Sequence, residues 1–204
     1  MQHLKGVLGF IAVVCSSGAA WATPVYLNKD NISVTVGERT APGTFNNTFN
    51  NSQTIEKVID APSADAEEFH NQTTHIWFKA AEGGGLELVF DFRISYNITT
   101  LHFWNYTGEG YDVDEIEFTF YDAADKVIGM VTVAPATGSS PGIRAEDIPL
   151  VSPLNTRWVR AYLTSNNGQI DFQNMGFSAE VADPALDPDG GSGTITLPAN
   201  GLGR

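Results

Sequence analysis

The residues of this chain best suited to ligand chemistry are polar and aromatic side chains in its turn-rich segments. An aromatic ring can pack against the apolar C–H face of a sugar, while amides, carboxylates, arginine and histidine bond the hydroxyl groups. Such groups usually lie on loops that a rigid scaffold holds in place. The candidates of this kind are His70, Asn71, Tyr106, Glu109, Tyr111, Arg144, Asn166, Asn167 and Gln169.

The sequence gives little support to catalysis. A glycosidase needs two carboxylates at a defined separation across the scissile bond, and no motif marks such a pair among the many acidic residues. Ser52, Ser63 and the histidines follow no triad order. The run Gly83-Gly84-Gly85 lacks the Lys-Ser/Thr of a phosphate loop and precedes a predicted strand, so it is interpreted as a flexible connection. We therefore predict that the protein is not an enzyme.

Charge and cysteine content exclude further classes. The 204 residues carry 24 acidic and 11 basic side chains, a net charge of -13, which argues against binding to nucleic acid or to anionic lipid. The single cysteine cannot form an internal disulfide. A zinc site is not expected either, because His70, His75 and His102 have no recognisable ligand spacing.

Both ends of the chain are expected to lie outside the fold. Lys5, the apolar run VLGFIAVV and the small-residue triplet Ala20-Trp21-Ala22 predict a signal peptide over 1–22, with a buried N-terminal helix as the alternative. Cleavage removes the cysteine, leaves no membrane-inserted segment, and places the protein outside the cell, in the periplasm or at the cell surface. A cysteine-free exported chain favours a bacterial origin. The segment 182–204 is rich in Pro, Gly and Asp and is interpreted as a tail or linker.

The segment between these ends, 23–181, has the alternation of β-strands. Apolar and polar residues alternate along 86–93, 115–120, 158–163 and 175–179, and runs at 32–36, 74–78, 98–106 and 127–133 are β-branched and aromatic. Only TIEKVI, at 54–59, is compatible with a short helix. The pattern predicts a single all-β domain, an antiparallel jelly-roll β-sandwich.

Three stretches of this domain resemble the galactose-binding-like β-sandwiches, which include discoidin (F5/8 type C) domains and bacterial carbohydrate-binding modules. They are QTIEKVIDA with TTHIWF, at 53–61 and 73–78, the stretch 86–129 that contains ITTLHFWNY, and RWVRAYLTSNNGQIDFQNMGFSAEV at 157–181. The family's Asp-Gly after the helix is replaced here by Asp60-Ala61, and the discoidin cysteine pair is missing.

The resemblance implies two sites. A structural calcium ion would be held by Asp60, Thr74 and Glu180, because calcium takes carboxylate and other oxygen ligands; the alternative is that Asp60 caps a turn and Glu180 is solvated. The ligand site would lie on loops at one end of the sandwich. We favour as ligand-binding residues His70, Tyr111, Arg144 and Asn166.

Simpler structural roles stay open for some of these residues. Tyr111 could pack into the core, and Asn166-Asn167-Gly168 could be a hairpin turn. The resemblance makes Trp77, Trp104 and Trp158 core residues. The resemblance implies a secreted, non-catalytic module that binds an extracellular glycan, with adhesion to a surface or matrix protein as the alternative.

Overall fold

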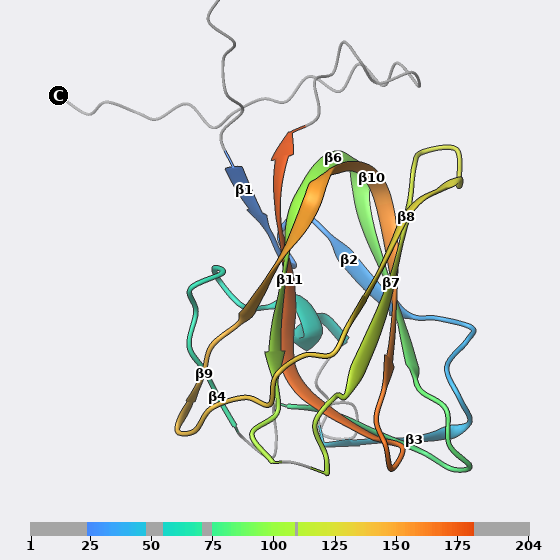
Figure 1. Ribbon diagram of the computed structural model, residues 1–204, viewed down its shortest axis with the longest axis vertical. Helices are drawn as coiled ribbons and strands as arrows, with labels where there is room; N and C mark the ends of the chain where they lie inside the picture. The colour runs from blue at the N-terminus through green and yellow to red at the C-terminus, as the bar shows by residue number, and fades with distance from the viewer. Residues whose placement is uncertain (1–23, 48–54, 71–74, 109, 182–204) are drawn as a thin grey trace, which may run out of the picture.

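The computed structural model describes residues 24–47, 55–70, 75–108 and 110–181 (Figure 1). The predicted signal peptide 1–22, which contains Cys15, and the predicted tail 182–204 lie outside the described residues. Among the residues described, no helix is long and apolar enough to span a membrane.

Nearly all the regular secondary structure of the described chain is β-strand, which confirms the predicted all-β class. The one helical segment among the described residues is η1, a 3-10 turn over Ile55–Ile59 within the predicted helix. The strands are β1 (Pro24–Leu27), β2 (Ser33–Val36), β3 (Gly43–Asn47), β4 (Glu68–Phe69), β5 (Ile76–Ala80), β6 (Leu86–Asn105), β7 (Glu115–Tyr121), β8 (Val127–Val133), β9 (Gly142–Ile143), β10 (Glu146–Thr164) and β11 (Gln169–Val181).

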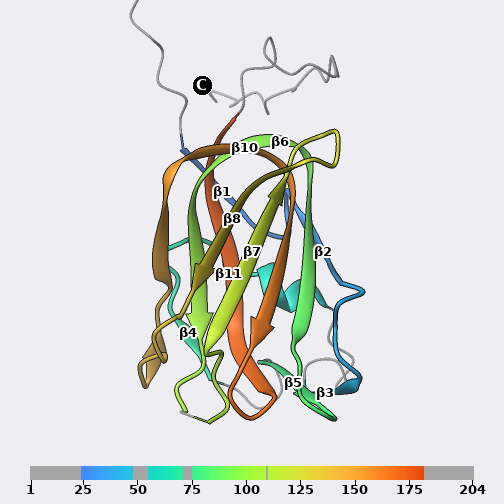
Figure 2. The same ribbon diagram turned by 45° about the vertical axis from the view of Figure 1, so that its right-hand side comes forward.

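Two long strands join the layers of the sandwich. β6 has 20 residues and β10 has 19, and both arch over one end of the molecule (Figures 1 and 2). The first part of β6 pairs with β2 and with the end of β10, whereas its second part pairs with β11 and with the start of β10. Between these parts Arg93 adopts a positive φ of 63°. One antiparallel sheet, in the order β3-β5-β11-β6-β10-β7-β8 with β1 paired to β11 and β2 to β6, therefore folds over into the layers of the sandwich. Strands β4 and β9 form a separate two-stranded sheet.

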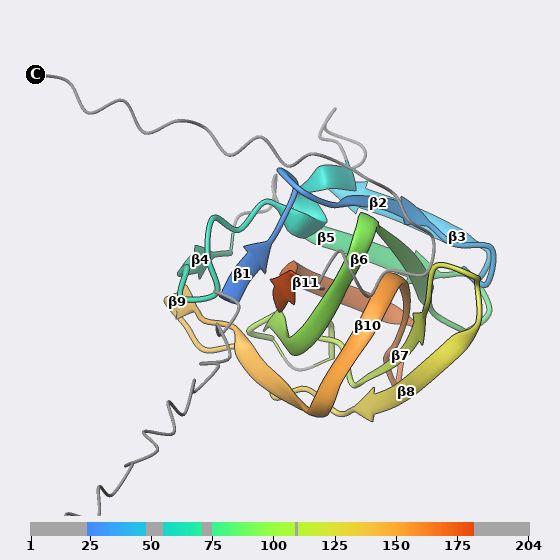
Figure 3. The ribbon, with the colours of Figure 1, turned by 90° about the horizontal axis from the view of Figure 1, so that it is seen from above.

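The core lies between these layers. Figure 3 shows the layers from the end where β6 and β10 arch over. The predicted alternation is confirmed along β6, since Leu88, Phe90 and Phe92 are fully buried. Phe177 of β11 is also fully buried, and its ring centroid lies 5.1 Å from that of Phe90 and 5.1 Å from that of Phe92. This aromatic cluster links the first part of β6 to the facing strand β11.

Replacing Phe177 by alanine should therefore weaken the contact between layers. Phe-to-Ala changes in a core cost about 3–5 kcal/mol, which should lower the melting temperature by on the order of 10 °C in a domain of this size. Thermal denaturation followed by circular dichroism measures the change. Met130→Ala is the control, because Met130 is 63% exposed. Equal melting temperatures for the two variants would contradict this account of the core.

Candidate functional site

A cavity of about 280 Å³ lies where β5 and β11 meet the β6–β7 connection. Its wall contains three aromatic side chains, a histidine and a carboxylate. They are His75, Trp77, Tyr106, Tyr111 and Asp171. The connection that carries Tyr106 and Tyr111 lies at the end of the sandwich opposite the arches of β6 and β10 (Figure 1). The cavity thus lies at one end of the sandwich, between a loop and two paired strands.

The pairing of β5 with β11 positions the strand half of this cavity. Trp77 is directly opposite Asp171 in the antiparallel register, so both side chains lie on the same face of the sheet. The neighbouring residues Ile76 and Phe78 point the other way and are buried in the core. Burial of the apolar side chains thus forces Trp77 and Asp171 to the opposite face, where the cavity lies.

A buried asparagine fixes the loop half of the cavity. The Asn105 amide donates to the carbonyl oxygens of Val113 and Ala136, at 3.0 and 3.1 Å, and its Oδ1 accepts from the N–H groups of Tyr106 and Val113, both at 2.9 Å. The loop is also joined to β11, because the Asp171 N–H donates to the Tyr111 carbonyl at 2.8 Å. These contacts position Tyr106 and Tyr111 without using either phenol.

A buried ionisable pair forms the polar part of the wall. His75 Nδ1 lies 2.7 Å from Asp171 Oδ1, and the residues are 1% and 3% exposed. Burial raises the pKa of Asp171 to about 6, although the hydrogen bond and the charge of His75 oppose the shift. Above that pH the carboxylate can accept hydrogen bonds from ligand hydroxyl groups.

Aromatic rings make up the rest of the wall. The Trp77 and Tyr111 rings meet edge to face at 6.2 Å, and Tyr111 meets Tyr106 edge to face at 6.3 Å. His70 extends this group, with its ring 4.7 Å from both His75 and Tyr106. Burial, followed by the nearby His75, lowers the pKa of His70, which favours the neutral ring. Burial, followed by Asp171 and Tyr111, raises the pKa of the Tyr106 phenol.

One donor in this wall has no protein partner in the described part of the chain. The Trp77 Nε1–H is buried, and no acceptor lies within hydrogen-bond distance there. Because an unpaired buried donor is costly, this indole N–H is a natural contact for a ligand oxygen.

The structure brings together two of the four predicted ligand-binding residues. His70 packs on the wall, and Tyr111 lines the cavity with 44% of its surface exposed, so Tyr111 is not a core residue. Asn166 lies in an exposed turn, the predicted alternative for this segment, and its N–H donates to Asp114 at 2.6 Å. Arg144 lies outside the wall, 3.5 Å from the Glu67 carboxylate. Binding roles for Arg144 and Asn166 stay predictions.

Sequence reasoning missed three residues of the cavity wall, His75, Trp77 and Asp171. Trp104 is fully buried as expected, but the core assignment was wrong for Trp77, which lines the cavity, and for Trp158, which stacks on Tyr121 at 3.8 Å. The signal available for Trp77 was its alternation with the apolar Ile76 and Phe78.

The residues predicted to bind calcium do not converge. Asp60 accepts a hydrogen bond from Asn174 on β11, whereas Glu180 lies six positions further along that strand, roughly 20 Å at 3.3 Å per residue. Thr74 lies outside the described residues. Within the described ranges, moreover, no group of three or more His, Cys, Asp or Glu side chains could hold a metal ion. Asp60 and Glu180, the two described members of the predicted set, are thus too far apart to hold one ion together.

Comparison with known proteins supports the fold assignment. No protein-family model and no curated protein matches the sequence. Among solved structures, the F5/8 type C domain of a Bacteroides fragilis protein aligns with a TM-score of 0.53 at 11% identity, over 78% of this chain and 98% of that one. CBM32-3 from a Clostridium perfringens family 31 glycoside hydrolase aligns with a TM-score of 0.51 at 10% identity, over 76% of this chain and 95% of that one. GH31 CBM32-2 bound to GalNAc aligns with a TM-score of 0.50 at 10% identity, over 72% of this chain and 96% of that one.

These likenesses confirm the architecture predicted from the sequence. The chain has the fold of the galactose-binding-like β-sandwiches, at sequence identities that establish the fold alone.

The raised pKa of Asp171 predicts a pH-dependent stability. Because the folded pKa, about 6, exceeds the ordinary 3.8, the contribution to stability is fully present below 3.8. It is lost as the pH rises through about 6. The loss is about 3 kcal/mol at 1.36 kcal/mol per unit. Asp171→Asn should lack this component, so its melting temperature relative to wild type should rise between pH 4 and pH 7. A difference that stays constant with pH would refute the assignment.

Proposed function

We propose that the protein is an exported, non-catalytic carbohydrate-binding module whose ligand site is the cavity between Trp77, Tyr111 and Asp171. A monosaccharide or the terminal sugar of a glycan would enter from the exposed side of Tyr111. The proposed ligand is a neutral sugar, because the protein is acidic overall and the wall contributes a carboxylate rather than an arginine.

The observation that carries this proposal is the chemistry of the wall. Rings of Trp77, Tyr106 and Tyr111 offer surfaces for the C–H groups of a sugar. Beside them, Asp171 supplies acceptors and the Trp77 indole supplies a buried donor without a described partner. Apolar walls with a few convergent polar groups are typical of small-ligand sites. GH31 CBM32-2, which shares the fold, is itself bound to GalNAc.

A second hollow, of about 390 Å³, lies on the layer formed by β6, β7 and β10 and is lined in part by Trp158 and Arg157. Two pairs of its polar groups bond to one another: Arg157 pairs with Asp91, and Trp158 Nε1 donates to Asp125 at 2.8 Å. Arg160 also lines this hollow, and its buried Nε has no hydrogen-bond partner in the described part of the chain. One face of the Trp158 ring is already stacked on Tyr121. The first cavity, whose lining has three aromatic rings where the second hollow has Trp158 alone, is therefore the better sugar site.

The alternative of protein adhesion has weaker support among the described residues. Their exposed large apolar side chains are distributed over β2, β4, β6, β8, β10 and the β6–β7 connection. Tyr111, one of these side chains, belongs to the cavity wall. Scattered apolar residues of this kind are usual on protein surfaces.

Replacing Tyr111 by alanine should weaken glycan binding without unfolding the protein. A glycan array identifies a sugar ligand, and calorimetric titration with that sugar measures affinity. Loss of the ring surface should raise the dissociation constant about tenfold, which corresponds to 1.4 kcal/mol. The melting temperature should change little, because Tyr111 is 44% exposed.

Trp158→Ala is the matched aromatic control, since Trp158 lines the second hollow instead. It should leave the affinity unchanged. Wild-type affinity in Tyr111→Ala together with weakened binding in Trp158→Ala would move the site to the second hollow. A chain that binds no glycan on the array would contradict the proposed function.

A further inference from the structure

The turn after η1, where the family resemblance implies calcium, contains a cation of its own. We propose that the ammonium group of Lys57 is the built-in counter-ion of the Asp60 turn, so that this turn needs no divalent ion for its stability. The inference concerns the scaffold and is independent of the proposed sugar site.

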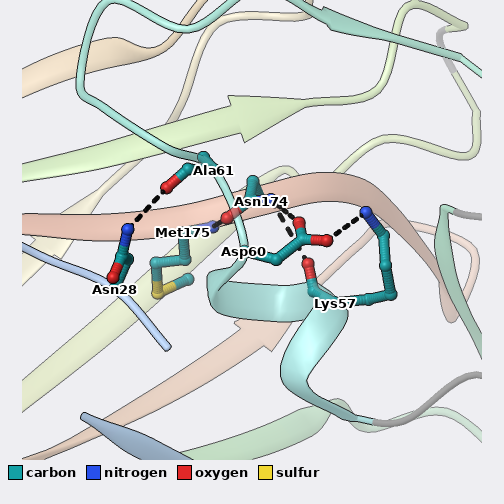
Figure 4. Close-up of polar contacts among 6 residues, drawn as sticks. All are labelled: Asn28, Lys57, Asp60, Ala61, Asn174 and Met175. Atoms are coloured by element: carbon teal, nitrogen blue, oxygen red, sulfur yellow. Dashed lines mark hydrogen bonds and ion pairs between the residues drawn. The ribbon is translucent and has the colours of Figure 1, made fainter. Parts of the chain in front are cut away.

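Both carboxylate oxygens of Asp60 are engaged by protein donors. Lys57 Nζ lies 2.6 Å from Asp60 Oδ2, and Asn174 Nδ2 donates to Asp60 Oδ1 at 2.7 Å (Figure 4). The oxygens that would face a calcium ion thus face an ammonium group and an amide. The negative carboxylate is thus paired with a positive charge without any metal.

The geometry of η1 brings the charges together. Lys57 and Asp60 are three positions apart, and in a 3-10 turn such residues lie one above the other. Their side chains are only 20% and 21% exposed. Solvent therefore screens this pair less than it screens a surface ion pair.

The last strand contributes a neutral group at this point. Asn174 is fully buried, and its amide also donates to the Lys57 carbonyl at 3.2 Å, while its Oδ1 accepts from the Met175 N–H at 3.1 Å. On the other side of the turn, Asn28 donates to the Ala61 carbonyl at 3.2 Å (Figure 4). The last strand does reach Asp60, but it presents an amide that donates rather than a carboxylate that would bind a cation.

The field of Lys57 extends to a second carboxylate. Burial, and to a smaller extent Asp60, raises the pKa of Glu68, while Lys57 lowers it. Burial raises the pKa of the nearby Tyr26 phenol as well, with contributions from Glu68 and Asp60. Lys57 is thus the positive charge that offsets two acidic neighbours.

Thermal melting of the whole protein in excess EDTA and in millimolar calcium chloride tests the proposal. The two melting temperatures should agree within about 1 °C. A structural ion would stabilise the fold by mass action, so chelation would then lower the melting temperature by on the order of 5–10 °C. Such a drop, reversed by calcium, would overturn the proposal.

Variants of Lys57 separate its charge from its packing. Lys57→Met should lower the melting temperature in both buffers, whereas Lys57→Arg, which keeps the charge, should restore most of the loss. Lys126→Met is the control, because Lys126 lies exposed in the β7–β8 turn. A Lys57→Met variant as stable as the control, or a Lys57→Arg variant as unstable as Lys57→Met, would overturn the proposal. If Lys57→Met does not fold, the chelation experiment and Lys57→Arg still decide.

Discussion

The pairing of β5 with β11 is the constraint on which the site depends. Ile76, Phe78, Ile170 and Phe172 must point inward, because these four side chains are buried in the core. The strand residues between them must then point outward, and the register puts Trp77 opposite Asp171. A slip of one residue would bury the carboxylate and the indole in the core and expose the apolar side chains. The same side-chain packing that forms the core thus also positions the site.

The Asp60 turn and the cavity differ in how fully the protein satisfies their polar groups. Around Asp60, an ammonium group and a buried amide occupy the carboxylate, which is the arrangement of a structural element. In the cavity, the burial of Asp171 raises its pKa, and the Trp77 donor has no partner among the described residues. Groups held in this costly state are more often found at binding sites than in scaffolds.

Local alternation was enough to predict most of the fold. It identified the strands around Phe90 and Phe118, because burial of one sheet face leaves a period-two pattern. The short turn at Val58 was predicted separately, from its compatibility with a helix. Alternation missed the first part of β10, which contains Pro149 and Pro153. Proline is tolerated there because residues 146–156 pair with β6 alone, so an edge strand needs no donor on its other side.

The site was less predictable, because its members meet only through long-range pairing. Tyr111 and His70 stood out as polar or aromatic residues in loops. The bond between His75 and Asp171, however, joins residues 96 positions apart, and no local pattern encodes such a contact. The same reason explains the calcium residues: which side chain of β11 reaches Asp60 depends on strand register, and that side chain is Asn174 rather than Glu180.

The most direct test of the central claim is the indole N–H region of the ¹⁵N–¹H NMR spectrum during titration with neutral monosaccharides, galactose and N-acetylgalactosamine first. The sugar site proposed here predicts that the Trp77 Nε1–H resonance shifts in a saturable manner. The indole N–H resonances of the buried Trp104, and of Trp158 in the second hollow, should not shift. A Trp77 resonance that does not move when the protein is saturated with a bound sugar would contradict the account.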